Sequence, residues 1–363
     1  MIFVKSDPLM RILITGNMGY VGPVVVAHLR ALWPEAELIG YDSGFFAPHL
    51  TTDDPFPERL LSRQVFGDMR DLAPCLLEGV DAVVHLAAIS NDPMGKRFEA
   101  PTIDINQVAS LRLARLARDA GVRNFVFASS CSVYGFAEGG PRREGDALNP
   151  LTAYARSKIG TEEGLHALDA PDMTITCLRF ATACGMSPRL RLDLVLNDFV
   201  AAALITGEVK VLSDGTPWRP LIDVADMARA IEWACGRAPA QGGRCLSVNA
   251  GSDRWNYQVS ELAEAVARAV PGTQVSINRD APPDKRSYRV DFALFRGLAP
   301  EHQPRLGLED SVGRLRDGIL RAHDIGTDFR RSDAVRLFTL ERHLEAERLS
   351  PDLRWRMAEE GAA

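Results

Sequence analysis

The chain lacks the features of a nucleic-acid-binding or membrane-spanning protein. Its 363 residues carry a formal charge of -6, and no cluster of Lys and Arg departs from that balance, so the basic surface that nucleic acid requires is not expected. No uninterrupted apolar run approaches the roughly 20 residues that cross a bilayer. The first ten residues contain no hydrophobic core typical of a signal peptide. We therefore expect a cytoplasmic protein without a membrane or nucleic-acid partner.

Cysteine is also scarce, and its spacing excludes several kinds of site. The six cysteines form no CxxC pair and show no metal-ligand spacing with the seven histidines; they are Cys75, Cys131, Cys177, Cys184, Cys235 and Cys245. Reduced, mostly buried thiols and no metal site are the expectation. No internal repeat or low-complexity segment is present.

The chain does contain alternating strand-like and helix-like segments, which are typical of a parallel sheet covered on both faces. The strand-like segments are 11–15, 36–42, 63–66, 81–86, 123–129 and 173–179, and the helix-like segments are 20–32, 71–78, 103–120 and 150–169. After residue 180 prolines divide the chain into short pieces, although 223–236 and 245–249 again read as a helix and a strand. This pattern predicts an α/β fold.

The predicted architecture is a Rossmann-type doubly wound parallel sheet with a smaller α/β substrate-binding domain. We assign 11–180, with returns near 223–250, to the dinucleotide-binding domain. The substrate domain then comprises 181–222 and 251–323. Residues 324–363 are charged and partly helical, and form a C-terminal helical extension of unknown role.

A glycine-rich turn follows the first strand-like segment. Glycines recur at three-residue spacing between a β-rich apolar run and an apolar helix-like segment. Such a turn lets the backbone approach a diphosphate, which then lies at the N–H groups and positive dipole end of the helix. The turn predicted to bind the cofactor comprises Gly16, Met18, Gly19, Tyr20, Val21 and Gly22.

An acidic residue ends the next strand-like segment. Asp42 follows Gly22 by 20 residues, the position from which a carboxylate accepts hydrogen bonds from the ribose hydroxyls of NAD. The same carboxylate repels the additional phosphate of NADP. The predicted cofactor is therefore NAD.

A tyrosine and a lysine lie four residues apart in a helical pattern. Tyr154 and Lys158 then share one helix face, where a nearby ammonium, together with an oxidised nicotinamide ring, favours the phenolate and makes proton transfer feasible. A serine cluster, Ser129 to Ser132, ends the apolar strand that begins at Phe125. Since ligands bind at the carboxyl ends of parallel strands, a serine there can hold a substrate oxygen near the tyrosine.

Together these motifs resemble the extended short-chain dehydrogenase/reductase family, which contains nucleotide-sugar epimerases and dehydratases. The resemblance covers roughly residues 11–320 and includes Gly-Asp-Met-Arg-Asp at 67–71, His-Leu-Ala-Ala at 85–88 and Val-Tyr-Gly at 133–135. It implies Ser130, Tyr154 and Lys158 as catalytic residues. The residues it adds to the cofactor site are Asp68, Met69, Leu86, Ala87, Ala88 and Asn106, with Tyr154 and Lys158 also touching the cofactor.

The resemblance further implies a nucleotide-diphosphate sugar as the substrate. Residues 178–185, 218–226 and 285–291 resemble the segments that bind its diphosphate and nucleotide, although Thr182 replaces the family's usual asparagine. Arginine suits such contacts because its planar fork pairs with two phosphate oxygens. The residues predicted to bind substrate are Ser90, Asn91, Ser130, Cys131, Ser132, Thr182, Arg189, Arg191, Arg219, Arg286 and Tyr288.

The reaction itself stays open between subfamilies. Cys131 and Ser132 follow Ser130 where 4,6-dehydratases of the family carry Asp-Glu, and a serine hydroxyl cannot replace a carboxylate base. This favours 4-epimerisation through a 4-keto intermediate. The alternatives are a 4-ketoreductase, a dehydratase or 3,5-epimerase that uses Cys131 or Ser132 as an acid or base, and a non-catalytic NAD-binding scaffold or redox sensor.

The resemblance also implies a homodimer. In this family, helices corresponding to 103–120 and 150–169 pair across a two-fold axis, and both carry small and apolar residues suited to close packing.

Overall fold

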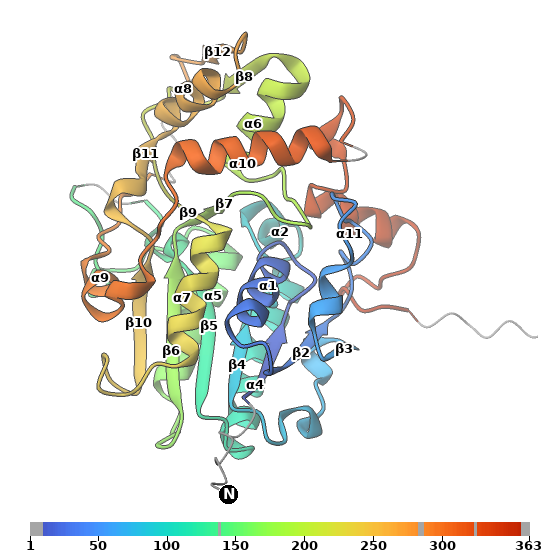
Figure 1. Ribbon diagram of the computed structural model, residues 1–363, viewed down its shortest axis with the longest axis vertical. Helices are drawn as coiled ribbons and strands as arrows, with labels where there is room; N and C mark the ends of the chain where they lie inside the picture. The colour runs from blue at the N-terminus through green and yellow to red at the C-terminus, as the bar shows by residue number, and fades with distance from the viewer. Residues whose placement is uncertain (1–9, 137–138, 282–286, 323–324, 357–363) are drawn as a thin grey trace, which may run out of the picture.

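The computed structural model describes residues 10–136, 139–281, 287–322 and 325–356. Its centre is a seven-stranded parallel sheet in the order β10-β6-β5-β4-β1-β2-β3 (Figure 1). The strands are β1 (Arg11–Thr15), β2 (Glu37–Asp42), β3 (Arg63–Phe66), β4 (Ala82–His85), β5 (Asn124–Ser130), β6 (Thr174–Phe180) and β10 (Cys245–Ala250). This arrangement confirms the predicted Rossmann-type fold.

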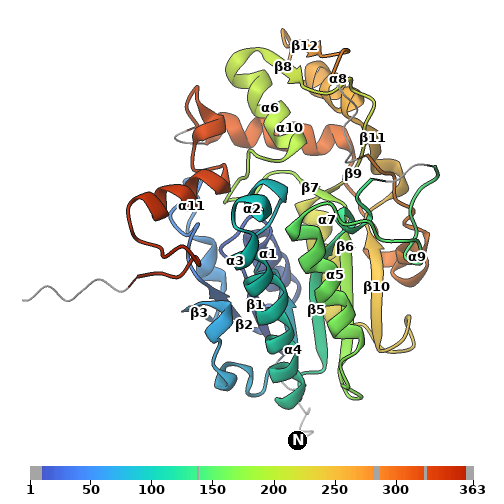
Figure 2. The same ribbon diagram turned by 180° about the vertical axis from the view of Figure 1, so that it is seen from behind.

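Helices cover both faces of this sheet. Helices α1 (Gly22–Leu32) and α7 (Val224–Cys235) lie on the face nearest the viewer in Figure 1. Helices α4 (Ala109–Asp119) and α5 (Ala153–His166) lie on the opposite face, seen in Figure 2. Because both faces are covered, strand residues of either orientation are buried, as the fully buried Ile12 and Leu13 of β1 illustrate.

Two predicted helices differ from the structure. Segment 71–78 forms only the short 3-10 turns Met69–Asp71 and Pro74–Leu77, because Pro74 can begin a new turn but cannot continue one. Segment 103–120 is not one regular helix. A π-helical turn, Asp104–Val108, joins α3 (Glu99–Ile103) to α4.

A smaller group of elements lies above the carboxyl ends of the main sheet (Figures 1 and 2). It contains the three-stranded sheet β11-β9-β7 and the two-stranded sheet β12-β8. Its strands are β7 (Thr182–Cys184), β8 (Glu208–Val211), β9 (Trp218–Asp223), β11 (Asn256–Gln258) and β12 (Gln274–Ile277), and its helices are α6 (Val195–Thr206), α8 (Val259–Ala269) and α10 (Leu308–Arg321). The short helix α9 (Ala293–Leu298) instead lies beside β10 at the edge of the main sheet (Figure 1). Helix α7 and strand β10 return to the main sheet between these pieces.

The C-terminal extension lies on the side of the main sheet formed by β2 and β3 (Figure 1). Its helix α11 (Arg336–Glu345) packs near α2 (Asp92–Arg97) in both ribbon views. Leu340, Leu349 and Leu353 form a separate apolar cluster with Phe45, after β2, and Ile89, after β4. The extension is therefore anchored on the loops that follow these two strands.

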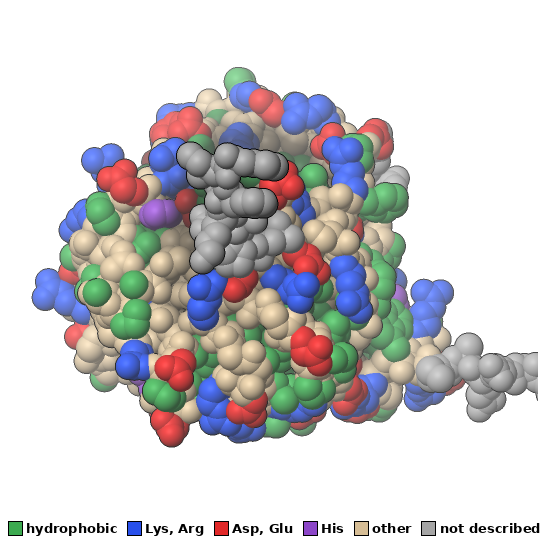
Figure 3. Space-filling model, turned by 60° about the horizontal axis from the view of Figure 1, so that its bottom comes forward, with side chains coloured by type: hydrophobic (Ala, Val, Ile, Leu, Met, Phe, Trp, Pro, Cys, Tyr) green, Lys and Arg blue, Asp and Glu red, His purple; other side chains and the backbone are tan. Residues whose placement is uncertain are grey.

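The charge distribution on the surface and the length of the helices bear on possible partners. On the face in Figure 3, Lys and Arg side chains are interspersed with Asp and Glu, without a large patch of one sign. None of the helices among the described residues is both long and apolar enough to cross a membrane.

Candidate active site

A cavity of about 850 Å³ opens where the carboxyl ends of the main strands meet the smaller group of elements. It brings together most of the predicted site residues, although they come from widely separated parts of the chain. Those that line it are Gly16, Gly19, Tyr20, Val21, Gly22, Asp42, Asp68, Met69, Leu86, Ala87, Ala88, Ser90, Asn91, Ser130, Ser132, Tyr154, Lys158, Thr182, Arg191, Arg219 and Tyr288.

The glycine-rich turn forms one wall of the cavity and needs its glycines for space. Gly16 has a φ of +74°, and a Cβ there would lie 2.5 Å from the Ala87 nitrogen. A Cβ on Gly22 would lie 2.3 Å from the Asn17 carbonyl oxygen. Val21 stands at the N-cap position of α1 and has no polar side chain to cap the first-turn N–H groups. The turn therefore combines close backbone approach with a helix N-terminus suited to an anion.

Asp42 lies at the end of β2 and is held by two backbone N–H groups. Met18 donates to its Oδ2 at 3.0 Å, and Gly44 donates to its Oδ1 at 2.8 Å. Burial raises the pKa of the Asp42 carboxyl, and these two hydrogen bonds act in the opposite direction. Met18 itself does not line the cavity, so its contribution is to orient this carboxylate.

Ser130, Tyr154 and Lys158 meet at the carboxyl end of β5. The Ser130 hydroxyl lies near Tyr154 and lowers the pKa of its phenol, and the Ser130 oxygen accepts from the Ser132 N–H at 3.1 Å. The Lys158 ammonium donates to the Ala128 carbonyl at 2.6 Å and lies 5.6 Å from the Tyr154 ring centroid. Burial lowers the pKa of Lys158 to about 8. Helix α5 supplies the tyrosine and lysine, and β5 supplies the serine.

Burial dominates the titration of Tyr154. Burial raises its pKa to about 12, while the Ser130 hydroxyl and the positive charge of Arg191 lower it. Lys158 is not among the charges that lower the pKa of Tyr154. Before ligands enter, Arg191 is thus the cation that favours the phenolate.

Arg191 belongs to a polar network on the cavity wall. It forms a bidentate ion pair with Asp193, at 2.9 and 2.8 Å, and donates to the Ser90 hydroxyl at 2.8 Å. Asn91 donates to the same carboxylate at 2.6 Å. The network joins the loop after β4 to the segment before α6. Asp193 also lines the cavity and was not among the predicted site residues.

Asp92 begins α2 beside this network. Thr152 donates to its carboxylate at 2.8 Å, and Asn91 acts as the N-cap of the helix by accepting from the Met94 N–H at 3.0 Å. Asp92 therefore helps to fix the start of α2, and it also lines the cavity.

The opposite wall comes from the smaller group of elements. Arg219 projects from β9 and donates to the Trp218 carbonyl at 2.9 Å, and Tyr288 lies against Tyr134 with 6.5 Å between ring centroids. Thr182 comes from β7. Arg286, predicted with them, lies outside the described residues.

The structure does not bring Cys131 or Arg189 to the cavity. Cys131 is fully buried, and its thiol donates to the Arg179 carbonyl at 3.0 Å; burial raises the pKa of this thiol strongly. Arg189 is fully buried and ion-paired with Glu58 at 2.6 Å. The prediction that Cys131 and Arg189 contact the substrate is therefore wrong. The Cys131 side chain points into the protein interior, and the Arg189 guanidinium is buried in an ion pair with Glu58.

Asn106 does not line the cavity but binds the backbone of Ile89, a residue that does. Its side-chain amide donates to the Ile89 carbonyl at 2.9 Å and accepts from the Ile89 N–H at 2.8 Å, which shapes the loop after β4. The resemblance implies Asn106 as a cofactor-binding residue, but it does not line the cavity and lies in the π-helical turn before α4.

Sequence reasoning missed the cavity residues that the C-terminal extension contributes. Arg330 and Arg336 line the cavity, together with Phe45 and Phe46 from the loop after β2. No motif marks these residues, since the extension has no pattern beyond charge and partial helicity.

Comparison with known proteins agrees with this geometry. Residues 12–251 match the model of the NAD dependent epimerase/dehydratase family. The chain belongs to this family. A UDP-glucose 4-epimerase from Mycolicibacterium smegmatis is 31% identical over 321 residues, which cover 84% of this chain and 97% of the relative.

Two solved structures are also similar. MoeE5 in complex with UDP-glucuronic acid and NAD has a TM-score of 0.72 and 25% identity, covering 86% of this chain and 99% of MoeE5. TunA, an NAD-dependent NDP-hexosamine 5,6-dehydratase, has a TM-score of 0.71 and 25% identity, covering 84% and 96%.

Family membership identifies the chain as an enzyme with NAD as its cofactor. The residues present fit this cofactor. The glycine turn leaves room for a diphosphate, and Asp42 presents a carboxylate where a ribose 2′-phosphate would be repelled. The described residues contain no group of three or more His, Cys, Asp or Glu placed to hold a metal ion.

Proposed function

We propose that the protein epimerises carbon 4 of a nucleoside-diphosphate sugar through a 4-keto intermediate. The observation that carries this proposal is the set Ser130, Tyr154 and Lys158 at the end of β5, without a carboxylate pair after Ser130. A 4-epimerase needs only these three groups and the cofactor. NAD, when bound, supplies the hydride acceptor and donor.

In this proposal Tyr154 exchanges the proton of the sugar's 4-hydroxyl, and Ser130 orients that oxygen. The phenol must lose its proton for this step, so its raised pKa has to fall when ligands bind. Arg191 and Lys158 are the cations available to this site. Lys158 also reaches the ribose of the nicotinamide half, as the family resemblance implies.

We further propose that the glycine turn, Asp42, Asp68 and Met69, and residues 86–88 bind NAD. The smaller group of elements, 181–222 and 251–323, then binds the nucleotide sugar. Arg219 and Tyr288 on one wall, and Ser90, Asn91 and Arg191 on the other, support this assignment because they converge on the predicted catalytic set. Ser132 adds a buried hydroxyl oxygen that lacks a hydrogen-bond partner among the described residues.

Dehydration is the second candidate, and the relatives include such enzymes. Simple 4,6-dehydration requires an acid and a base after Ser130, where this chain has Cys131 and Ser132. The buried Cys131 thiol, with its raised pKa, is unsuited to that work. A 4-ketoreductase would use the same three residues but would consume reduced cofactor.

The test is incubation of the purified protein with NAD⁺ and a panel of nucleotide sugars, with products resolved by NMR. We expect the 4-epimer of one sugar, formed without loss of water and without net change in NADH absorbance. A 4-keto-6-deoxy sugar would establish dehydration instead. Turnover only of a supplied 4-keto sugar, with oxidation of NADH, would establish a ketoreductase.

We also propose that the protein is a homodimer that pairs through the α4 and α5 face (Figure 2). Val108, in the turn before α4, is 56% exposed and so is accessible to a partner subunit. Multi-angle light scattering at micromolar concentration should give twice the 39.8 kDa chain mass. Val108→Arg should then shift the protein toward monomer, and a monomeric parent protein would contradict the proposal.

A further inference from the structure

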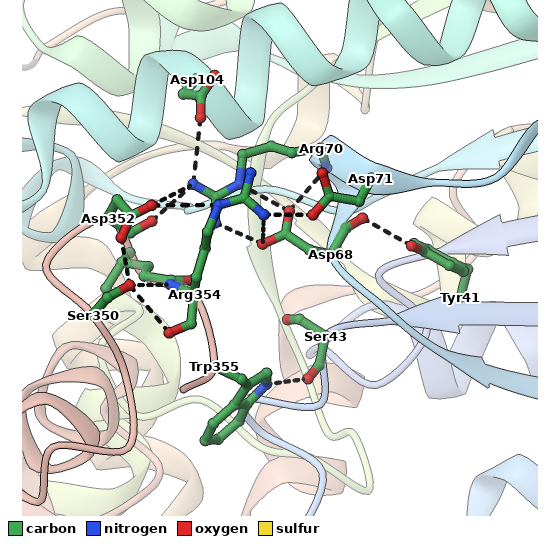
Figure 4. Close-up of polar contacts among 11 residues, drawn as sticks. Tyr41, Ser43, Asp68, Arg70, Asp71, Asp104, Ser350, Asp352, Arg354 and Trp355 are labelled. Atoms are coloured by element: carbon green, nitrogen blue, oxygen red, sulfur yellow. Dashed lines mark hydrogen bonds and ion pairs between the residues drawn. The ribbon is translucent and has the colours of Figure 1, made fainter. Parts of the chain in front are cut away.

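The C-terminal extension covers the end of the cavity that Asp42 and Asp68 mark. Trp355 donates its indole N–H to the Ser43 carbonyl at 2.6 Å. Arg70, directly after Met69, donates to the Asp352 carbonyl at 2.8 Å, and Arg354 pairs with Asp71. Figure 4 shows Arg70 and Arg354 in one polar cluster with the neighbouring carboxylates, and the Trp355–Ser43 contact as a separate pair.

Apolar packing holds the same segment in place. The Trp355 ring lies 5.5 Å from Phe45 and 5.0 Å from His343, measured between ring centroids. Leu340 and Leu353 are fully buried in the same cluster. The extension is thus a packed part of the molecule, and it covers loops that border the cavity.

Arg336, the first residue of α11, brings a positive charge to the cavity. Its side chain lines the cavity although the residue is only 2% exposed, and its guanidinium lies 4.5 Å from the Phe46 ring centroid. Among the described residues, the guanidinium donates to two backbone carbonyls and to no side chain; they are those of Arg189 at 3.0 Å and Asp333 at 3.4 Å.

The neighbouring arginines are ion-paired with carboxylates, whereas Arg336 is not ion-paired with any described residue. Arg189 pairs with Glu58, and Arg191 pairs with Asp193. Within the described parts of the chain, no carboxylate forms an ion pair with Arg336. Burial and the nearby positive charge of Arg191 lower its pKa to about 9, against the smaller effects of Asp193 and Asp42. A buried guanidinium in such surroundings is unfavourable until an anion joins it.

The position of this charge indicates which anion it meets. Phe46 belongs to the loop that follows Asp42, the predicted ribose ligand. The segment bonded by Arg336 is tied to the glycine turn, because the Ser187 hydroxyl donates to the Tyr20 carbonyl at 2.6 Å. Arg336 is thus joined to the loop that follows Asp42 and to the segment tied to the turn at the start of α1, where a dinucleotide carries its diphosphate.

We propose that the C-terminal extension completes the NAD site, with Arg336 binding a diphosphate oxygen of the cofactor and residues 350–355 holding the extension over its adenosine end. The proposal rests on NAD as the family's cofactor and is independent of which sugar reaction follows. It predicts that Arg336 contributes to cofactor affinity through charge and that bound NAD stabilises the extension.

The first experiment measures binding of NAD⁺, ADP-ribose and adenosine to the full chain freed of cofactor, by calorimetry or ligand NMR. Arg336→Gln should weaken NAD⁺ and ADP-ribose binding about tenfold to a hundredfold and leave adenosine binding unchanged. Arg342→Gln is the matched control, since Arg342 lies on the same helix, is exposed and pairs with Asp333. It should bind all three ligands as the parent does.

Three outcomes would overturn the proposal. Unchanged NAD⁺ binding by Arg336→Gln excludes the diphosphate contact. An equal loss for adenosine assigns Arg336 a merely structural role. A loss confined to UDP-glucose or UDP-glucuronic acid assigns it to the substrate. If Arg336→Gln does not fold, Arg336→Lys, which keeps the charge but has fewer donors, should show the same ligand pattern with a smaller loss.

A second experiment needs no variant. Trypsin cleavage within the extension, after Arg342 or Arg348, is followed by mass spectrometry with NAD⁺, UDP or no ligand. NAD⁺ should slow this cleavage severalfold, and UDP should not. Cleavage that NAD⁺ leaves unchanged would show that the cofactor does not stabilise the extension.

Discussion

The two ends of the cavity are built in different ways. At the glycine turn, main-chain atoms dominate: Gly16 and Gly22 leave room that a Cβ would fill, and backbone N–H groups hold Asp42. At the other end, side chains from distant segments converge, among them Arg191 and Arg219. A wall made of backbone atoms keeps its shape when side chains change, which suits the binding of one constant cofactor. A wall made of side chains can change residue by residue, which suits a family whose members act on different sugars.

Tyr154 lines the cavity with residues of both ends, and changing it is expected to have the largest effect on turnover. Tyr154→Phe should lower turnover about 10²- to 10⁴-fold, because only the proton-transferring oxygen is lost. NAD⁺ affinity should stay near that of the parent, as measured by calorimetry beside steady-state kinetics. Turnover near the parent's value would falsify the proposed mechanism.

Arg219 tests the end made of side chains. Arg219→Ala should raise the Michaelis constant for the nucleotide sugar about tenfold to a hundredfold, from the loss of a charge-assisted contact worth about 1.5–3 kcal/mol. Turnover at saturation should change much less, because such a contact acts equally in the ground and transition states. Parent-like nucleotide-sugar binding by Arg219→Ala would remove this residue from the substrate site.

Asp42 tests the end made of backbone. Asp42→Ala should reduce the preference for NAD over NADP about tenfold, because the carboxylate no longer repels the 2′-phosphate. It should also destabilise the protein by about 1–3 kcal/mol, since the Met18 and Gly44 N–H groups lose their acceptor. Affinities for both cofactors and a urea unfolding curve measure the two effects. Equal binding of NAD and NADP by the parent would contradict this interpretation.

Cys131 should give the smallest effect on activity. Its thiol faces the Arg179 carbonyl in the protein interior, so Cys131→Ala should keep turnover close to that of the parent. If the thiol served as an acid or base, the same change would cost about 10²- to 10⁴-fold. Steady-state kinetics at matched protein stability distinguish these results, and a large loss would restore the 3,5-epimerase alternative.

Much of the sheet could be predicted because parallel strands are marked by local patterns. The apolar run of β1, the glycine turn and the acidic end of β2 are contiguous, and each has a physical requirement that short-range sequence expresses. The same holds for Tyr154 and Lys158, whose spacing alone places them on one face of α5. The family and its cofactor followed from these motifs, and the comparisons confirmed both.

The direction of single side chains near the cavity could not be read from the sequence. Cys131 follows Ser130 directly, yet its thiol points into the core because the chain turns there. The arginines at 189 and 191 looked equivalent, but Glu58, more than 130 residues earlier, neutralises the first. Such partners are chosen by how distant segments pack.

The sequence by itself determined a Rossmann-type sheet with a turn for NAD and a tyrosine–lysine pair, because each depends on the backbone geometry of a few neighbouring residues. Only the tertiary structure decided which arginines keep a free charge and that the extension reaches the cavity. Packing buries Arg336 beside Phe46 and leaves it without a carboxylate among the described residues. That outcome depends on long-range contacts and desolvation, which no local pattern records.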